Sequence, residues 1–186
     1  VCGRVFGRDR GLPALVLNTH LDHVDPGDPD LWPAPPYGGV IRDGRILGRG
    51  ACDIKGPLAV QVYSPAALLA AGLRPRRDVV YCGMVQEEVG GAGARYWVEH
   101  LDYPVEVIVL GEPTANALAL GHRGIVQMWL TFYGRSAHAS APERGKNPNY
   151  ALAAFLSQLE HAQSELGSHK HLGATSIAPT IVRVDT

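Results

Sequence analysis

The chain has 186 residues, of which 46% are hydrophobic and 19% charged, enough apolar material for one large domain or two small ones with a packed core. Its 17 lysines and arginines nearly balance 18 aspartates and glutamates, so the basic excess of a nucleic-acid-binding protein is absent and no nucleic-acid partner is expected. No apolar run approaches the roughly 20 residues that cross a bilayer, so no membrane partner is expected either.

The cysteines and the two ends of the chain also limit the class of protein. Cys2, Cys52 and Cys82 are odd in number and widely spaced, which indicates reduced thiols rather than a disulfide framework and predicts a cytoplasmic protein. The charged opening residues lack the apolar stretch of a secretory signal peptide. Because the chain begins with Val1 and stops at Thr186 inside strand-like sequence, we expect it to be an internal piece of a longer protein.

The first part of the chain alternates short apolar runs with helical segments. Buried strands are predicted over 14–19, 78–85 and 105–110, and helices over 55–71 and 92–100. A loop rich in proline and glycine, 25–39, leads into a hairpin over 40–46, whose turn is predicted at Asp43-Gly44. This alternation of strands and helices predicts an α/β fold with helices on the faces of the sheet.

The pattern changes near residue 121, and a domain boundary is placed at 121–124. Beyond it we predict a strand over 125–133, a helix over 149–166, where apolar residues form a stripe, and a strand over 176–185. The predicted domains are 1–121 and 122–186.

Acidic or histidine side chains follow three of the predicted strands. His20 and Asp22 come after the first, Glu87 and Glu88 after the second, and Glu112 after the third. Because ligands of open α/β sheets bind at the carboxyl ends of the strands, we expect these side chains to converge on one edge. One histidine among carboxylates suits zinc, manganese or cobalt better than a thiolate-built structural site.

The spacing of these residues suggests a division of roles. His20 and Asp22 face the same side of an extended segment, so Asp22 can orient the imidazole. One of the adjacent Glu87 and Glu88 can ligate a metal while the other acts as a general base. Taken singly, a loop histidine or a glutamate pair is common on protein surfaces; their repeated position after apolar strands favours a metal site.

Two neighbouring residues leave alternatives open. Asp53 lies in a glycine-rich turn just before a predicted helix, where it would serve either as a metal ligand or as the cap of that helix. His23 is expected to stay outside the metal site. Neither a Gly-x-Ser-x-Gly nucleophile elbow nor a His-Glu-x-x-His helix occurs, which excludes two common hydrolase centres.

Five motifs resemble those of the ArgE/DapE-type metallopeptidases in order and rough spacing. They are NTHLD at 18–22, GRGACDIKG at 48–56, QEE at 86–88, GEPT at 111–114 and GRSAHASAPERG at 134–145. That family includes acetylornithine deacetylase, succinyl-diaminopimelate desuccinylase, aminoacylases and carboxypeptidase G. The resemblance covers nearly the whole chain and implies a two-zinc α/β catalytic domain interrupted by a smaller α+β lid domain that forms homodimers.

The resemblance also implies a role for each matched residue. Asp53 would bridge two zinc ions, with His20 and Glu112 completing one site and Glu88 holding the other; cobalt or manganese are alternative metals. Glu87 would be the general base, Asp22 would orient His20, and His138 would reach the active site of the partner subunit to stabilise an oxyanion. The peptide bond between Asp53 and Ile54 is expected to be cis.

The implied reaction is hydrolysis of an amide bond in an N-acyl amino acid or small peptide, as in a deacetylase or desuccinylase. A dipeptidase or carboxypeptidase of the same family is the alternative, and a non-catalytic homologue is a third reading. No residue of 114–186 matches the family's final histidine ligand. The 186-residue chain by itself is therefore expected to be inactive.

Overall fold

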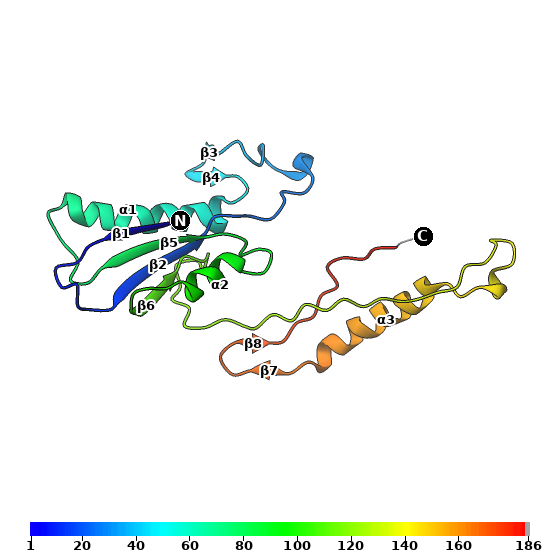
Figure 1. Ribbon diagram of the computed structural model, residues 1–186. Coiled ribbons are helices and arrows are strands. Elements are labelled where there is room, and N and C mark those ends of the chain that lie inside the picture. The colour runs from blue at the N-terminus through cyan, green and yellow to red at the C-terminus, as the bar shows by residue number, and fades with distance from the viewer. Residues whose placement is uncertain (185–186) are drawn as a thin grey trace. The chain divides into compact units, whose positions relative to one another are not determined.

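The computed structural model describes residues 1–184. The chain divides into two units, Val1–Ala117 and Leu118–Thr186 (Figure 1). The first unit is built on one sheet with the strand order β1-β5-β2-β6. Its strands are β1 (Cys2–Val5), β2 (Ala14–His20), β5 (Val79–Met84) and β6 (Val105–Leu110). Because β2 runs parallel to both of its neighbours, its carboxyl end lies at the same edge of the sheet as theirs; β1 is antiparallel to β5.

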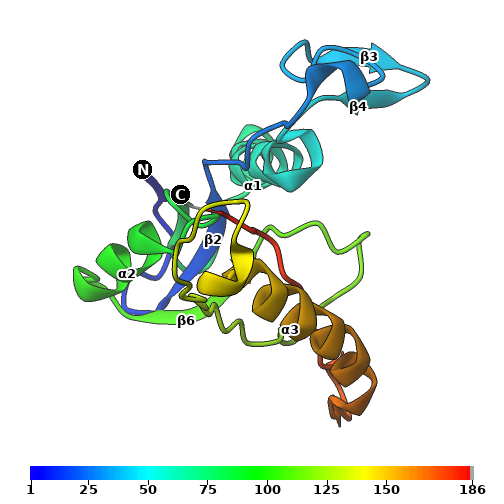
Figure 2. The same cartoon turned by 90° about the vertical axis from the view of Figure 1, so that its right-hand side faces the viewer.

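Helices cover both faces of this sheet. α1 (Gly56–Ala70) and α2 (Ala92–Glu99) lie on opposite sides of β2 (Figure 2). On the face toward α2, the core consists of residues from the two central strands: Ala14, Val16, Val80, Cys82 and Met84. Trp97, Tyr103 and Val105 pack against this core. The predicted α/β fold with helices on both faces is confirmed.

The predicted ends of the three strands and of the two helices that cover the sheet agree with the structure to within one residue. The three predicted strands are β2, β5 and β6, and the two predicted helices are α1 and α2. The predicted burial of the third strand is wrong, because β6 forms at the edge of the sheet and most of its side chains are exposed. α1 begins at Gly56, beside Pro57, and continues through Pro65 to Ala70. Proline is well accommodated in the first turn, because the amide hydrogens there have no partner within the helix.

The predicted hairpin is also present. β3 (Val40–Arg42) pairs with β4 (Arg45–Leu47), and the turn residues Asp43 and Gly44 have φ angles of 51° and 71°. Positive φ at both central residues is typical of the primed turns that match the twist of a hairpin, which favours Asp-Gly at this place. A single helical turn stands before the hairpin, at Pro29–Leu31, and a wider, irregular turn with non-helical backbone at its centre precedes α1, at Ala51–Lys55.

The second unit contains one long helix and little paired strand. α3 (Pro148–Ala162) is capped by Asn147, whose side chain accepts the amide hydrogen of Asn149 at 2.9 Å. Single helical turns lie before and after α3, and β7 (Ser168–His169) pairs with β8 (Gly173–Ala174). The prediction of a helix over 149–166 is right in type, although α3 ends at Ala162.

The strand predictions for this unit are wrong within the described residues. Neither 125–133 nor 176–184 belongs to a strand, and Asp185 lies outside the described residues. Ile125, Val126 and Trp129 are more than three-quarters exposed. Apolar, β-branched sequence favours an extended chain, but a strand also requires a neighbour for its ladder of hydrogen bonds. The predicted boundary at 121–124 lies close to the division after Ala117, and the assignment of the second part as a lid stays a prediction.

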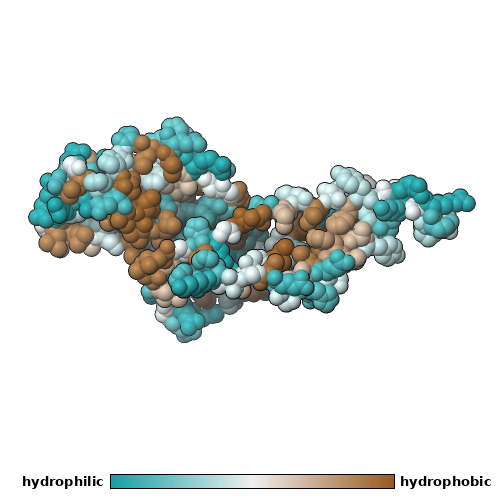
Figure 3. Space-filling view, turned by 90° about the horizontal axis from the view of Figure 1, so that it is seen from below, coloured by the Kyte–Doolittle hydropathy of each residue, from teal (hydrophilic) through white to brown (hydrophobic). Residues whose placement is uncertain are grey.

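Apolar side chains also reach the surface of both units (Figure 3). In the first unit they include four consecutive residues of the edge strand β6, Val107–Leu110, which are 45–57% exposed. Over the described range, no helix combines the length and the apolar character that crossing a membrane would need.

Candidate metal centre

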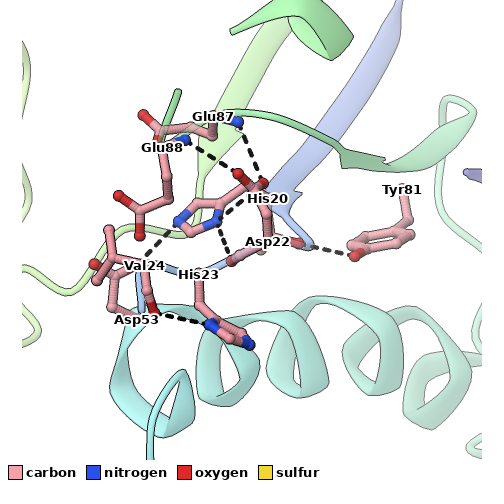
Figure 4. A network of polar contacts seen from close by, with 9 residues as sticks. His20, Asp22, His23, Val24, Asp53, Tyr81, Glu87 and Glu88 are labelled. Carbon is pink, nitrogen blue, oxygen red and sulfur yellow. Dashed lines mark hydrogen bonds and ion pairs between the residues drawn. The ribbon is translucent and has the colours of Figure 1, made fainter. Parts of the chain in front are cut away.

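Three side chains from distant parts of the sequence meet where β2 and β5 end. His20 is the last residue of β2, Glu88 lies in the turn after β5, and Asp53 lies in the turn before α1 (Figure 4). One imidazole nitrogen and one oxygen from each carboxylate all lie within 4.8 Å of one another. The sequence predicted that His20 and Glu88 would converge from their positions after strands, and it named Asp53 as a further candidate ligand; the structure brings these three side chains together.

The hydrogen bonds of His20 fix the orientation of its ring. The residue is 4% exposed, and Nδ1 of its ring lies 2.9 Å from the backbone oxygen of Asp22. A carbonyl oxygen only accepts, so Nδ1 carries the proton and donates it. Nε2 then faces Oδ1 of Asp53 at 2.9 Å. In the neutral imidazole both facing atoms are acceptors, so the contact needs a proton or a cation between them.

This arrangement fits a metal ion. Histidines that bind metals usually donate the hydrogen of their other ring nitrogen to a backbone carbonyl or carboxylate, as His20 does. Carboxylate oxygens and an imidazole nitrogen form a donor set that zinc, manganese and cobalt accept. His20, Asp53 and Glu88 therefore supply donors of the right kind, already gathered and oriented.

The side chains around the centre carry an excess of negative charge. Burial alone would lower the pKa of His20, but its bond to the Asp22 carbonyl and the nearby carboxylates of Asp53 and Glu112 raise that pKa above its ordinary value. Burial raises the pKa of Glu112, and the neighbouring acidic side chains raise it further against the opposing effect of His20. Glu112 lies outside the group of three yet within their electrostatic reach. A divalent cation would neutralise this excess charge.

Asp22 is connected differently from the predicted way. Its Oδ1 lies 3.7 Å from Nδ1 of His20, beyond hydrogen-bond length, and its backbone carbonyl orients the ring instead. The two carboxylate oxygens accept the backbone amide hydrogens of Glu87 and Glu88, each at 3.2 Å. Burial would raise the pKa of Asp22, but these amides and His20 lower it below its ordinary value. The expectation that the Asp22 side chain bonds the imidazole is wrong; this side chain anchors the turn that carries both glutamates.

The backbone around Asp53 separates this residue from the helix that follows. Its φ and ψ of −116° and 88° are not helical, and the first turn of α1 has no side-chain cap. The capping alternative for Asp53 is therefore wrong. The peptide bond between Asp53 and Ile54 is cis, as the resemblance implied.

Two further histidines were singled out in the sequence. Nδ1 of His23 donates to the carbonyl of Val24 at 2.9 Å, and His23 is not in the metal-binding group found among the described residues. His138 lies in the second unit, where its Nδ1 accepts the amide hydrogen of Ser140 at 3.2 Å and lies 2.8 Å from the Ser140 hydroxyl. Because Nδ1 accepts, a neutral His138 carries its proton on the exposed Nε2.

One contact beside the centre was not predicted. Thr19, next to His20, shares a hydrogen bond of 2.8 Å with the hydroxyl of Tyr81 on β5 (Figure 4). The pairing of β2 with β5 sets Thr19 against Gly83 and Leu17 against Tyr81, so the two hydroxyls meet diagonally. Sequence patterns show which residues alternate on a strand, but they do not set the register between two strands.

Comparison with known proteins gives a consistent family. The model of peptidase family M20/M25/M40 matches residues 16–181. A probable succinyl-diaminopimelate desuccinylase of Staphylococcus epidermidis is 30% identical over 173 residues, which cover 92% of this chain and 42% of that protein. The chain thus spans less than half the length of this relative.

Two solved structures share the fold. The M20 family metallo-carboxypeptidase Sso-CP2 of Sulfolobus solfataricus gives a TM-score of 0.51 at 21% identity, over 59% of this chain and 25% of that one. Human carnosine dipeptidase 1 gives 0.50 at 25% identity, over 59% and 24%. With the family model matching most of its length, the chain belongs to peptidase family M20/M25/M40.

Proposed function

We propose that this chain is part of a metal-dependent amidohydrolase that cleaves an amide bond in an N-acyl amino acid or small peptide. The observation that carries the proposal is the 2.9 Å approach of His20 Nε2 to the Asp53 carboxylate, with the opposite ring nitrogen tied to a carbonyl and Glu88 alongside. The name of the Staphylococcus relative, a desuccinylase, supports the N-acyl class of substrate.

In this proposal, the metal ligands are the residues that the resemblance assigned. His20, Asp53, Glu88 and Glu112 would hold two zinc ions, with Asp53 shared between them, and cobalt or manganese would suit the same donors. Bound zinc supplies a Lewis acid for the scissile carbonyl and lowers the pKa of the attacking water. The raised pKa of Glu112 and the acidic side chains around it support a site that needs positive charge.

Glu87 is the proposed general base. Asp22 holds its backbone amide at 3.2 Å, which fixes the start of a side chain that is itself exposed at the edge of the centre. From there the carboxylate takes a proton from the attacking water and returns it to the leaving amine. The free Nε2–H of His138 is the proposed donor to the oxyanion that develops on the substrate carbonyl.

We infer that the second unit acts as a lid and associates as a homodimer, so that His138 serves the partner subunit. Symmetric pairing is the commonest form of such association, and it would let one residue type complete both centres. A cytoplasmic location is proposed from the widely spaced cysteines.

A dipeptidase or carboxypeptidase activity is the second candidate, favoured by the titles of the two solved structures that share the fold. Initial rates of the zinc-loaded complete protein on N-acetyl and N-succinyl amino acids, set beside rates on dipeptides, separate the two classes. We expect faster turnover of the N-acyl substrates. Folded, zinc-bound protein that turns over neither class would instead indicate a non-catalytic homologue.

A matched pair of variants ties the activity to the centre. Asp53→Asn should lose both bound zinc and turnover, because the shared carboxylate is removed. Asp43→Asn lies in the hairpin turn, where asparagine also tolerates positive φ, and should retain both. Full activity in Asp53→Asn would overturn the proposed metal centre.

A further inference from the structure

Outside the metal centre, two cysteine side chains face each other across neighbouring strands. Cys2 lies on the edge strand β1 and Cys82 on β5, and they are direct partners in the antiparallel ladder. Their sulfur atoms are 3.1 Å apart. Both thiols are free, and the pair shares no residue with the metal centre.

The position of the pair in the ladder brings the side chains close. Val1 and Gly83 exchange both of their backbone hydrogen bonds, at 2.9 and 2.8 Å. The next pair along, Cys2 and Cys82, is therefore of the non-hydrogen-bonded kind, in which opposite side chains approach most closely. Opposite Cβ atoms in such pairs lie near 4.5 Å, and disulfides need about 3.5–4.5 Å. Only a small closing movement separates the thiols from bonded geometry.

We propose that Cys2 and Cys82 form a reversible disulfide by exchange with a low-molecular-weight disulfide such as oxidised glutathione. The Cys2 thiolate attacks one sulfur of that disulfide, its S–S bond breaks and one small thiol leaves. The Cys82 sulfur gives its proton to solvent, attacks the Cys2 sulfur and expels the second small thiol. In sum, two protein thiols are oxidised to one disulfide and the small disulfide is reduced to two thiols.

The difference in exposure sets the order of these steps. Cys2 is exposed on the edge strand, whereas Cys82 is fully buried, so the reagent reaches Cys2 first. Burial and the neighbouring Cys2 thiol raise the pKa of Cys82 to about 12, which makes Cys82 a poor direct target for reagents in solvent. Its contact with Cys2 is what lets it close the bond.

The disulfide would join the edge of the sheet to the strand that leads to the metal centre. Cys82 is paired on its other side with Asn18 of β2, whose side-chain amide donates to the Cys82 carbonyl at 2.9 Å. Two residues further on, Met84 pairs with His20. A covalent link at Cys82 would therefore fasten β1 to the central pair of strands, and within residues 1–184 β1 pairs with no strand other than β5.

The test is to map disulfides in the protein after equilibration in glutathione buffers of increasing oxidised fraction. Free thiols are blocked with N-ethylmaleimide, and unreduced peptides are analysed by mass spectrometry. We expect a Cys2–Cys82 linked peptide, lighter by two hydrogens, that grows with oxidised glutathione and disappears with dithiothreitol. Cys52→Ser is the matched control, because Cys52 lies on neither strand, and it should give the same link.

A second measurement tests the effect on stability. Oxidised protein should melt at least about 5 °C above reduced protein, because the link closes a long loop of the unfolded chain. Cys2→Ser, a change at an exposed position, should lose this difference, and it keeps the test usable if Cys82→Ser fails to fold. A stable glutathione adduct on Cys2, a link to Cys52 or to another molecule, or an unchanged melting temperature on oxidation would each overturn the proposal.

Discussion

Asp22 serves two segments at once through different atoms. Its backbone carbonyl accepts the Nδ1 hydrogen of His20, and its carboxylate accepts the amide hydrogens of Glu87 and Glu88. One residue therefore fixes both the ring that faces Asp53 and the turn that supplies the two glutamates. The spacing of His20 and Asp22 predicted that the two would interact, but a spacing of residues does not say whether backbone or side-chain atoms make the contact.

The two glutamates should separate in their roles when each loses its charge. In the complete protein, Glu87→Gln should lower kcat by about 10²–10⁴ with zinc content unchanged, since the proposed general base is lost and no proposed ligand is. Glu88→Gln should lose zinc, because Glu88 belongs to the group that gathers around His20 and Asp53. Zinc is measured by mass spectrometry and kcat with an N-acyl amino acid.

Glu99→Gln at the end of α2 is the control for this pair and should match the unaltered protein in both measurements. If Glu87→Gln and Glu88→Gln lost zinc equally, the division into base and ligand would be wrong.

At the scale of elements, the strands and helices of the first unit were the predictable ones. β2, β5 and β6 are short apolar runs bounded by turn residues, and α1 and α2 begin at or just after a glycine. The extended segment 125–133 has similar composition but no ladder partner among the described residues. Strand propensity belongs to a single segment, whereas forming a strand also requires a second segment that pairs with it. A prediction from one segment therefore fails where the pairing partner determines the outcome.

The approach of α2 to the end of β5 depends on Gly93. A Cβ atom at this position would lie 2.5 Å from the backbone oxygen and 2.6 Å from the backbone nitrogen of Val85, just before the Glu87–Glu88 turn. Backbone cannot yield as a flexible side chain can, so Gly93→Ala should cost about 1–3 kcal/mol of unfolding free energy. Urea denaturation measures the loss.

Gly3→Ala is the matched control for this substitution. Gly3 lies in β1, and no heavy atom lies within 4 Å of the added methyl group. We expect a change within about 0.5 kcal/mol there. Equal unfolding free energies of Gly93→Ala and Gly3→Ala would mean that α2 does not pack closely against the backbone of Val85 in solution.

The buried thiol of β5 predicts a loss of stability in alkaline solution. The pKa of Cys82 is raised to about 12 in the folded protein by burial and by Cys2, whereas an unfolded thiol titrates near 8.5. Stability is therefore full below the unfolded pKa and falls as pH rises toward the folded one, because only the unfolded chain releases the proton. By about pH 10.5 the reduced protein should lose about 2.7 kcal/mol.

The measurement is urea unfolding under reducing conditions at about pH 8 and about pH 10.5, compared with Cys82→Ala. Tyrosines titrate in the same range, so the difference between the two proteins is the quantity of interest. The variant should lose less stability than the unaltered protein over this interval. Parallel losses would show that the Cys82 thiol is not protected from ionisation.

At the scale of the whole molecule, the proposed dimer predicts complementation. In the complete protein, His138→Ala would lack the proposed oxyanion donor and Glu87→Gln the proposed general base, so each variant alone should be nearly inactive. A mixed dimer would contain one centre with both groups intact. Mixing the two variants under conditions of subunit exchange should therefore restore part of the activity, measured as the initial rate on an N-acyl amino acid.

Ser140→Ala mixed with Glu87→Gln is a useful comparison, because it removes only the hydroxyl beside His138 Nδ1 and leaves the backbone amide. Its rate should exceed that of the His138→Ala mixture. If exchange is verified and the His138→Ala mixture regains no activity, His138 does not act across a dimer.

The metal centre draws its candidate ligands from places as far apart as His20 and Glu112. In polymer terms, a cation bound there is a cross-link that closes several long loops at once. The unfolded chain does not hold these ligands together and would bind the cation more weakly. Zinc affinity should therefore register as folding stability, about 2.7 kcal/mol at 100 times the dissociation constant. Added zinc should raise the melting temperature and a chelator should reverse the rise, whereas Asp53→Asn should respond to neither.

Without the cation, the crowded carboxylates repel one another: burial raises the pKa of Glu112 most, and the charges of Asp53, Glu87 and Glu88 raise it further. The metal-free form would therefore be less stable than the metal-bound form, in which the cation offsets this repulsion. If zinc raised the melting temperature of Asp53→Asn by the same amount, the stabilising metal site would lie elsewhere in the protein. If Asp53→Asn does not respond, the concentration of metal around the protein would determine how much of it is folded, and not only how much of it is active.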